Sequence, residues 1–311
     1  MLQFLAVDGS LTVVRPGGLG DTILVLPALE RLRRRFPGAR LTLVGSLWAE
    51  SLRPLVPFPL EVARFDGADL LPLFDPSAAA DPTGLFGRAA MVLLYTDTPE
   101  EPLVVNARRF CPGNVAVWPV SPSPGISAAD HFAAAVPGEG RAEPSLGVPE
   151  AMREWGRRWI GSRLGNGVLP LAVHPGSGGR RKCWPAAQFA EVARRWGRPV
   201  VLLEGPADRA AAEDFLAAAP GVPVARAAGL EVPQAASLIA GCAAFVGNDS
   251  GLSHLAAALG APTAAVFGPT DPAIWAPRGR CVRVLGRGKG IGWPSVEEVA
   301  EALEFFKASL S

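Results

Sequence analysis

The chain has 311 residues, of which 49% are hydrophobic and 19% are charged. This usage is ordinary for a globular protein and the length predicts about two domains, so a disordered or highly charged tail protein is excluded. Thirty Lys and Arg residues against 29 Asp and Glu residues give a formal net charge of +1. Such a balance provides no overall field for nucleic acid, so we expect no nucleic-acid partner and local binding of any anionic ligand.

The cysteines and the first residues predict the compartment. Cys111, Cys183, Cys242 and Cys281 are widely separated and form no C-x-x-C pair, which argues against a zinc site and a secreted disulfide framework. The apolar start, residues 1–7, has no basic flank and no small-residue cleavage pattern. We therefore predict a cytoplasmic protein.

The first half of the chain predicts strands that alternate with helices, as in a parallel α/β sheet. A helix is expected from Asp21 or Thr22 to Phe36, where Pro37 and Gly38 end it. Prolines are dense between Pro54 and Pro124, so that stretch is expected to be loop-rich. The expected strands are 11–14, 41–44, 91–95 and 115–118.

The second half repeats this alternation more regularly and predicts a doubly wound domain. The expected strands are 171–174, 199–203, 222–226, 243–247 and 263–267, and the expected helices are 185–196, 208–218, 232–240 and 250–259. The uncharged stretch 250–270 is interrupted by glycines and prolines, so it is interpreted as helix, turn and strand rather than as a membrane span.

These patterns predict an α/β protein with two Rossmann-like domains. The expected divisions are an N-terminal domain over 1–150, a helical connector over 151–168, a C-terminal domain over 169–290 and a terminal helix over 291–311.

The first strand-to-helix turn that is suited to chemistry contains Gly17, Gly18 and Gly20, followed by Asp21. Glycines let the backbone approach a ligand, and the N–H groups at a helix start attract negative charge. The turn lacks the third small residue of a dinucleotide fingerprint, because Ile23 stands there, and it lacks the Lys of a P-loop. Asp21 fits either a helix N-cap or a general base, and spacing alone leaves both interpretations open.

The second such turn, 174–185, combines Ser177, Gly178 and Lys182 with two arginines. Backbone N–H groups, a hydroxyl and cations can surround a diphosphate without a metal. The alternative is a solvated basic loop. His174 by itself indicates a hydrogen-bonding residue at a strand end.

The third turn places Asp249, Ser250 and Gly251 at a strand end, with His254 one turn into the next helix. Together these groups could bind one anion or sugar at the sheet edge where open α/β sheets bind ligands. The alternative gives Asp249 or Ser250 a capping role and leaves His254 as a packed or surface residue.

The motifs in this order resemble glycosyltransferase family 9, the heptosyltransferases of lipopolysaccharide core synthesis and their relatives. The resemblance is carried by Gly20-Asp21 with Leu26-Pro27-Ala28-Leu29, His174-Pro175-Gly176-Ser177 with Lys182, Trp184 and Pro185, Asn248-Asp249-Ser250-Gly251 with His254-Leu255-Ala256, and Phe267-Gly268-Pro269-Thr270.

The resemblance implies a GT-B architecture, with two Rossmann-like domains facing each other across a cleft, and sugar transfer that inverts the anomeric centre without a metal or cofactor. It makes Asp21, beside the acceptor, the general base. The residues that match donor-binding positions are Ser177, Lys182, Ser250 and Gly251 for the diphosphate, Asp249 beside the sugar, His254 as the motif histidine and Asp208 for the nucleotide ribose.

The implied partners are a nucleotide-sugar donor, with ADP-heptose as the first choice, and a cell-envelope glycan or glycolipid acceptor. A lipid-linked acceptor would bring the protein to the inner face of the cytoplasmic membrane, where the arginines at 31, 33, 34 and 35 could contact anionic lipid; a solvated helix face is the alternative. Two other functions remain open, a sugar-nucleotide epimerase or hydrolase of the same fold and a non-catalytic nucleotide-sugar-binding subunit.

Overall fold

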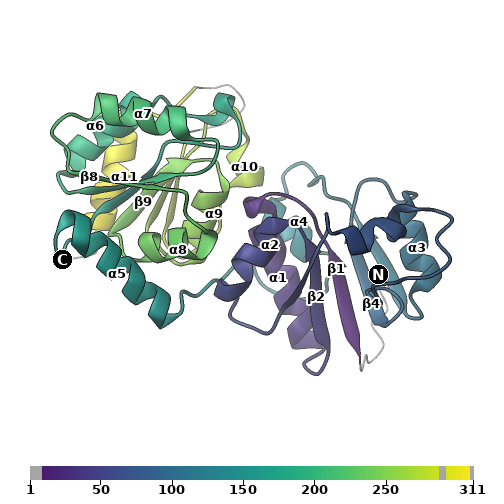
Figure 1. The fold of residues 1–311 in the computed structure, drawn as a ribbon. Coiled ribbons are helices and arrows are strands. Elements are labelled where there is room, and N and C mark those ends of the chain that lie inside the picture. The colour runs from purple at the N-terminus through teal and green to yellow at the C-terminus, as the bar shows by residue number, and fades with distance from the viewer. Residues whose placement is uncertain (1–8, 287–291, 309–311) are drawn as a thin grey trace. The chain divides into compact units, whose positions relative to one another are not determined.

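The computed structural model describes residues 9–286 and 292–308 (Figure 1). The chain divides into two compact units, 1–144 and 145–311, each built on a parallel sheet. This confirms the predicted α/β fold class. The expected boundary at 290/291 lies outside the described residues, as do residues 1–7 and the last residues of the expected terminal helix.

The first unit contains a five-stranded sheet in the order β3-β2-β1-β4-β5, with every neighbouring pair parallel. Its strands are β1 (Ser10–Val14), β2 (Arg40–Gly45), β3 (Glu61–Arg64), β4 (Ala89–Tyr95) and β5 (Asn114–Trp118). The chain direction across the sheet reverses between β1 and β4. In open α/β sheets such a switch point, at the carboxyl ends of the strands, is where ligands bind.

The helices of the first unit pack on this sheet through continuous apolar faces. They are α1 (Leu19–Arg35), α2 (Leu47–Leu52), α3 (Pro102–Phe110) and α4 (Ala128–Ala133), with the 3₁₀ helices η1 (Arg53–Leu55) and η2 (Ala68–Phe74). In α1, Ile23, Leu29 and Leu32 are fully buried. Arg31, one of the arginines considered for lipid contact, instead donates hydrogen bonds to the carbonyls of Ala133, Val136 and Gly140.

The proline-dense stretch 54–124 is more ordered than the sequence predicted. It contains β3, η2 and α3 in addition to the two expected strands. Pro102 is the first residue of α3, a position where proline's fixed φ and missing N–H favour a helix start rather than a loop. The loop before β4 is fixed by the Asp81 carboxylate, which accepts N–H hydrogen bonds from the loop backbone, those of Thr83, Gly84, Phe86 and Gly87.

The second unit contains a six-stranded parallel sheet in the order β11-β10-β9-β6-β7-β8, with its switch point between β6 and β9. Its strands are β6 (Leu171–His174), β7 (Val200–Glu204), β8 (Val224–Ala228), β9 (Ala244–Asn248), β10 (Thr263–Val266) and β11 (Val282–Leu285). The edge strand β11 was not predicted, because its side chains are largely exposed and give no buried apolar run.

Helices cover both faces of this sheet (Figure 1). They are α5 (Glu150–Leu164), α6 (Ala186–Trp196), α7 (Arg209–Ala218), α8 (Val232–Ala240), α9 (Gly251–Ala258), α10 (Pro272–Trp275) and α11 (Val296–Ala308), with the 3₁₀ helix η3 (Arg180–Lys182). The helix expected as a connector, α5, belongs to the second unit and packs against α8. On the other face, Phe189, Phe215 and Phe306 join α6, α7 and α11 in one buried cluster.

The uncharged stretch 250–270 folds as α9, a turn and β10, as predicted. Across the described ranges, none of the helices is both long and apolar enough to cross a membrane.

Candidate functional site

The second and third predicted turns meet at the switch point of the second sheet. The first of them follows β6 and the other follows β9, and these strands are neighbours. Ser177 Oγ donates a hydrogen bond to the Asp249 carbonyl at 2.8 Å, and Lys182 Nζ lies 2.9 Å from Asp249 Oδ2. Residues that are far apart in the sequence, and that were predicted to bind one donor, therefore contact one another.

Asn248 clamps the two turns together. Its fully buried amide donates to the carbonyls of Pro175 and Gly176, at 2.8 and 3.1 Å, and accepts the Trp184 N–H at 2.9 Å. Asn248 was predicted only as a member of the motif, without a role of its own. An amide at the end of an otherwise apolar strand was the available signal, because buried amides in proteins are almost always hydrogen-bonded.

Asp249 is a buried carboxylate with two side-chain partners. Its Oδ2 atom accepts from Lys182 Nζ and from Thr270 Oγ1 at 2.8 Å, and Thr270 lies in the turn after β10. The Asp249 side chain is 8% exposed, whereas that of Lys182 is 40% exposed. The Asp249 carboxylate therefore holds the Lys182 ammonium on its buried side, and the solvent-exposed side of the ammonium stays accessible to an anionic ligand.

The start of α9 lies beside this pair. Ser250 is the N-cap residue with an extended backbone, Gly251 is the first helical residue, and His254 is buried one turn later. Gly178, in the turn after β6, is exposed, and no described atom lies within 4 Å of a Cβ placed on it. Backbone N–H groups at a helix start and in an open glycine loop form an anion site when they converge.

Asp208 lies in the same edge, but its carboxylate faces the protein. Oδ2 accepts from His174 Nε2 at 2.9 Å and from the Gly205 N–H at 3.0 Å. Burial raises the pKa of Asp208, but hydrogen bonds from His174 and from the backbone N–H groups of Gly205 and Ser177 outweigh burial. The pKa of Asp208 therefore lies below its ordinary value. A Cβ on Gly176 would come within 2.1 Å of the Asp208 carboxyl group, so this approach requires glycine there.

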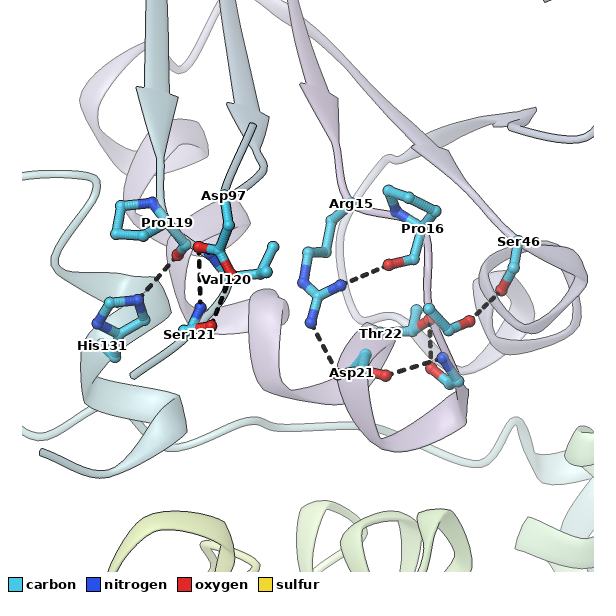
Figure 2. Close-up of polar contacts among 12 residues, drawn as sticks. Arg15, Pro16, Asp21, Thr22, Ser46, Asp97, Pro119, Val120, Ser121 and His131 are labelled. Carbon is cyan, nitrogen blue, oxygen red and sulfur yellow. Dashed lines mark hydrogen bonds and ion pairs between the residues drawn. The ribbon is translucent and has the colours of Figure 1, made fainter. Parts of the chain in front are cut away.

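The first predicted turn forms the corresponding edge of the first unit (Figure 2). Asp21 Oδ1 pairs with Arg15 Nη2 at 2.7 Å, and Oδ2 accepts the Gly18 N–H at 2.9 Å. The interpretation of Asp21 as an N-cap is wrong, because α1 begins at Leu19, Gly18 is the N-cap and Asp21 is the third helical residue. Gly20 lies in the first turn of the helix. The Asp21 side chain is 34% exposed, so its carboxylate is open to a substrate.

Gly17 is required by this geometry. Its φ of +153° is one that residues with a side chain rarely adopt, and a Cβ there would lie 2.8 Å from Asp21 Oδ2.

Arg15 was not predicted as a site residue. It is buried, and its guanidinium lies 4.8 Å from the centroid of the Phe132 ring. The sequence signal available for it was an arginine directly after an apolar strand, six residues before a carboxylate.

The turns after β4 and β5 and helix α4 contribute further polar groups to this edge (Figure 2). Asp97, after β4, accepts from the Ser121 hydroxyl at 2.6 Å and from the Val120 N–H at 2.9 Å. The Ser121 hydroxyl and these backbone bonds hold the pKa of Asp97 below its ordinary value. His131 Nε2 donates to the Pro119 carbonyl at 2.8 Å. Neither Asp97 nor His131 was predicted as a site residue.

Within residues 9–286 and 292–308, no group of three or more His, Cys, Asp or Glu side chains is placed to hold a metal ion. The four cysteines are free.

Comparison with known proteins finds a family match within the second unit. The model of glycosyltransferase family 9 (heptosyltransferase) matches residues 167–296, which lie in the second unit. Lipopolysaccharide heptosyltransferase 2 of Salmonella typhimurium strain LT2 is 39% identical over 114 residues, which are 34% of this chain and 33% of that protein. The matched segment thus spans about a third of the relative's length. These matches confirm the resemblance inferred from the motifs.

Two solved structures share the fold over nearly the whole chain. A glycosyl transferase family 9 protein from Veillonella parvula has a TM-score of 0.80 and 22% identity, covering 98% of this chain and 99% of that one. The E. coli ADP-heptose lipopolysaccharide heptosyltransferase II has a TM-score of 0.75 and 22% identity, covering 96% and 99%. At this identity the likeness establishes the fold, and it confirms the GT-B class.

Proposed function

We propose that this chain, whose residues 167–296 carry a glycosyltransferase family 9 domain, is an inverting, metal-independent glycosyltransferase. It would move a heptose from ADP-heptose to a cell-envelope glycan or glycolipid. The observation that carries the proposal is the meeting of Ser177, Lys182 and Asp249 at the switch point of the sheet that the family match covers. The name of the E. coli structural neighbour supplies ADP-heptose as the first donor to test.

On the donor side, the proposed roles follow from charge. The Lys182 ammonium, the N–H groups around Gly178 and Gly251, and the start of α9 would bind the diphosphate and neutralise charge as it leaves. Asp249 holds Lys182 in place and lies beside the donor sugar. Fixed cations and N–H groups supply here what a divalent cation supplies in other transferases.

On the acceptor side, Asp21 is the proposed general base. Its carboxylate takes the proton of the acceptor hydroxyl while that oxygen forms a bond to the anomeric carbon. The bond between the anomeric carbon and the diphosphate oxygen breaks in the same step, and the nucleoside diphosphate leaves with the electron pair. Attack from the face opposite the leaving group inverts the anomeric centre. Arg15 and the Gly18 N–H orient the carboxylate.

The acceptor determines the proposed location. A lipid-linked glycan would place the protein at the inner face of the cytoplasmic membrane as a peripheral protein. Arg34, one of the helix arginines considered for that contact, forms an exposed ion pair with Glu30. Exposed pairs of this kind contribute little energy, so the arginine stays available to lipid.

The proposal is tested by calorimetric titration of the purified protein with ADP, UDP, GDP and ADP-heptose, with and without EDTA. We expect ADP and ADP-heptose to bind in both conditions. Transfer is then measured by mass spectrometry of a heptose-deficient lipopolysaccharide acceptor incubated with ADP-heptose.

The other outcomes identify the competing functions. Turnover of ADP-heptose without acceptor indicates an epimerase or hydrolase, whereas binding without any turnover indicates a binding subunit. Preference for UDP or GDP is consistent with a glycosyltransferase but excludes ADP-heptose as its donor. Loss of binding with EDTA contradicts metal independence.

A further inference from the structure

Three side chains of the second unit form a continuous hydrogen-bonded line. Asp208 Oδ2 lies 2.9 Å from His174 Nε2, and His174 Nδ1 lies 3.3 Å from Ser250 Oγ. The three residues follow β7, β6 and β9, which are adjacent in the sheet. The topology therefore places them side by side along one edge. His174 and Asp208 are buried, and Ser250 is partly exposed beside Lys182 and Asp249.

The Asp208 carboxylate determines which nitrogen of His174 carries a proton. Asp208 already accepts the Gly205 N–H, and its lowered pKa keeps it ionised, so it can only accept. His174 Nε2 must therefore carry a hydrogen. The remaining nitrogen, Nδ1, faces the Ser250 hydroxyl, and its protonation decides the direction of that hydrogen bond.

The two protonation states present different groups to a ligand. If Nδ1 has no hydrogen, Ser250 donates its only hydrogen to His174 and offers a ligand lone pairs alone. A phosphate oxygen, which is an acceptor, then gains no hydrogen bond from Ser250. If Nδ1 carries a hydrogen, it donates to Ser250 Oγ, and the hydroxyl hydrogen is free to bond an anion.

We propose that His174 is a positioning residue that takes up a proton when a sugar nucleotide binds, and so turns the Ser250 hydroxyl toward the diphosphate. The inference rests on the proposed function, because that function places the diphosphate at Ser250. The proton comes from solvent on binding and returns to solvent when the nucleoside diphosphate leaves. The protonated His174 imidazole carries the added positive charge beside the ligand. The Asp208 carboxylate compensates this charge from the buried side.

The charged surroundings of His174 are compatible with such uptake. Asp208 faces Nε2 from the start of α7. Burial, and then the negative charge of Asp208, raise the pKa of the nearby Cys183 thiol. The Lys182 ammonium, next along the edge, is paired with Asp249. A bound diphosphate adds negative charge on the Ser250 side, and this favours the imidazolium.

Calorimetric titration with ADP-heptose in buffers of different ionisation enthalpy measures the uptake directly. The diphosphate of ADP-heptose is esterified at both ends and does not titrate near neutral pH, so uptake reports on the protein. We expect net proton uptake on binding, of at most one proton per ligand, since one imidazole accepts one proton. We also expect ¹⁵N chemical shifts to show His174 with hydrogen only on Nε2 in the free protein and on both nitrogens in the complex.

Variants separate this role from a structural one. His174→Gln keeps both bonds, because its amide can donate to Asp208 and accept from Ser250, but it cannot take up a proton. It should fold, bind ADP-heptose about tenfold more weakly and show no uptake, as expected for one lost charge-assisted bond. Ser250→Ala should lose the uptake too, and Ser250→Thr should retain it. Ser237→Ala removes a buried hydroxyl from α8 and should leave uptake unchanged.

The outcomes distinguish the two proposals. Binding of ADP-heptose without proton uptake, or uptake that persists in His174→Gln, contradicts the role of His174 and leaves the proposed transferase intact. Absence of ADP-heptose binding in the wild type overturns the proposed function, and the inference fails with it.

Discussion

The carboxyl edges of the two sheets are built differently. In the second unit, buried side chains link the turns after four strands: Asn248 and Asp249 join those after β6, β9 and β10, and Asp208 adds the one after β7. In the first unit, Asp21 is held by one arginine and one backbone N–H. The second edge is one connected polar network, whereas at the first edge the contacts of Asp21 and those of Asp97 form separate groups.

This difference is consistent with the extent of the family match. The family match covers only residues 167–296, although the fold is shared over nearly the whole chain. A network of buried hydrogen bonds restricts each of its members, because removing one partner leaves the others unsatisfied. Contacts through backbone atoms and exposed groups place few limits on which residue types a position accepts. The sequence of the first unit can therefore change while its fold stays the same.

The largest expected effect is on the rate of transfer, from a substitution that changes only the edge of the first unit. Asp21→Asn should reduce transfer by about 10²–10⁴-fold, the usual contribution of a general base, and leave ADP-heptose binding unchanged. Transfer rates and calorimetric titration measure the two quantities. Asp97→Asn, which changes another carboxylate at the same edge, is the matched control and should retain transfer. Equal losses in both variants would remove Asp21 from the role of base.

A substitution in the buried network of the second edge should lower the stability of the second unit. Asn248→Ala leaves the Trp184 N–H and the carbonyls of Pro175 and Gly176 without their partner, which should lower the free energy of unfolding of the second unit by about 3 kcal/mol. Urea unfolding followed by tryptophan fluorescence measures this change. Asn166→Ala, at an exposed asparagine, should change it by less than about 0.5 kcal/mol. Similar values for both would show that the amide is no clamp.

Lys182 tests the charge that the second edge offers to a ligand. Lys182→Met should weaken ADP binding by about 10–100-fold, through loss of a charge-assisted contact. Arg181→Met, at the exposed neighbour in the same turn, should weaken it by about threefold or less. The two dissociation constants, measured at equal ionic strength, decide between a diphosphate site and a solvated basic loop; equal effects favour the loop.

Arg15 tests whether orientation of Asp21 matters. Arg15→Met should lower kcat for transfer by about tenfold and leave the KM for the donor unchanged, because the carboxylate loses one of its two anchors. Arg15→Lys keeps a charge and should recover part of kcat. A change in donor KM alone would indicate general damage to the fold rather than a role at Asp21.

The smallest effect concerns acid stability of the first unit. Burial raises the pKa of Asp81, but hydrogen bonds from the Thr83 hydroxyl and from backbone N–H groups outweigh it, so the pKa lies below the ordinary value of 3.8. Because the folded-state pKa is lowered, the ionised group stabilises the fold above pH 3.8, and this stabilisation is lost as the pH falls through the lower folded-state value.

Asp81→Asn should therefore cost about 1 kcal/mol at pH 7 and progressively less below pH 3.8. Urea unfolding of both proteins between pH 7 and pH 3 measures the difference. A difference that does not change with pH would show that Asp81 acts without its charge. Asp69→Asn, at an exposed carboxylate for which the structure gives no hydrogen bond, provides the control.

Sequence reasoning predicted most regular elements of the second unit closely, because its inner strands β6, β7, β9 and β10 are buried on both faces and give clear apolar runs. Strand 171–174 and helix 232–240 were predicted with the bounds that the structure has. It missed β3 and β11, which are short edge strands with partly exposed side chains. It also began α1 at Asp21 or Thr22 rather than at Leu19, since glycines before a carboxylate look like a cap.

The sequence by itself determined the fold class and the positions of the glycine-rich turns to which we assign the site, because apolar periodicity and glycines at strand ends are local properties. Only the tertiary structure decided which side chains pair. That Lys182 meets Asp249 and that Asp208 meets His174 depends on strand order and on the approach of distant segments, and that Arg15 pairs with Asp21 depends on how the turn after β1 folds. Hydrogen bonds require distances within a few tenths of an ångström, and the order of the strands in the sheet sets those distances.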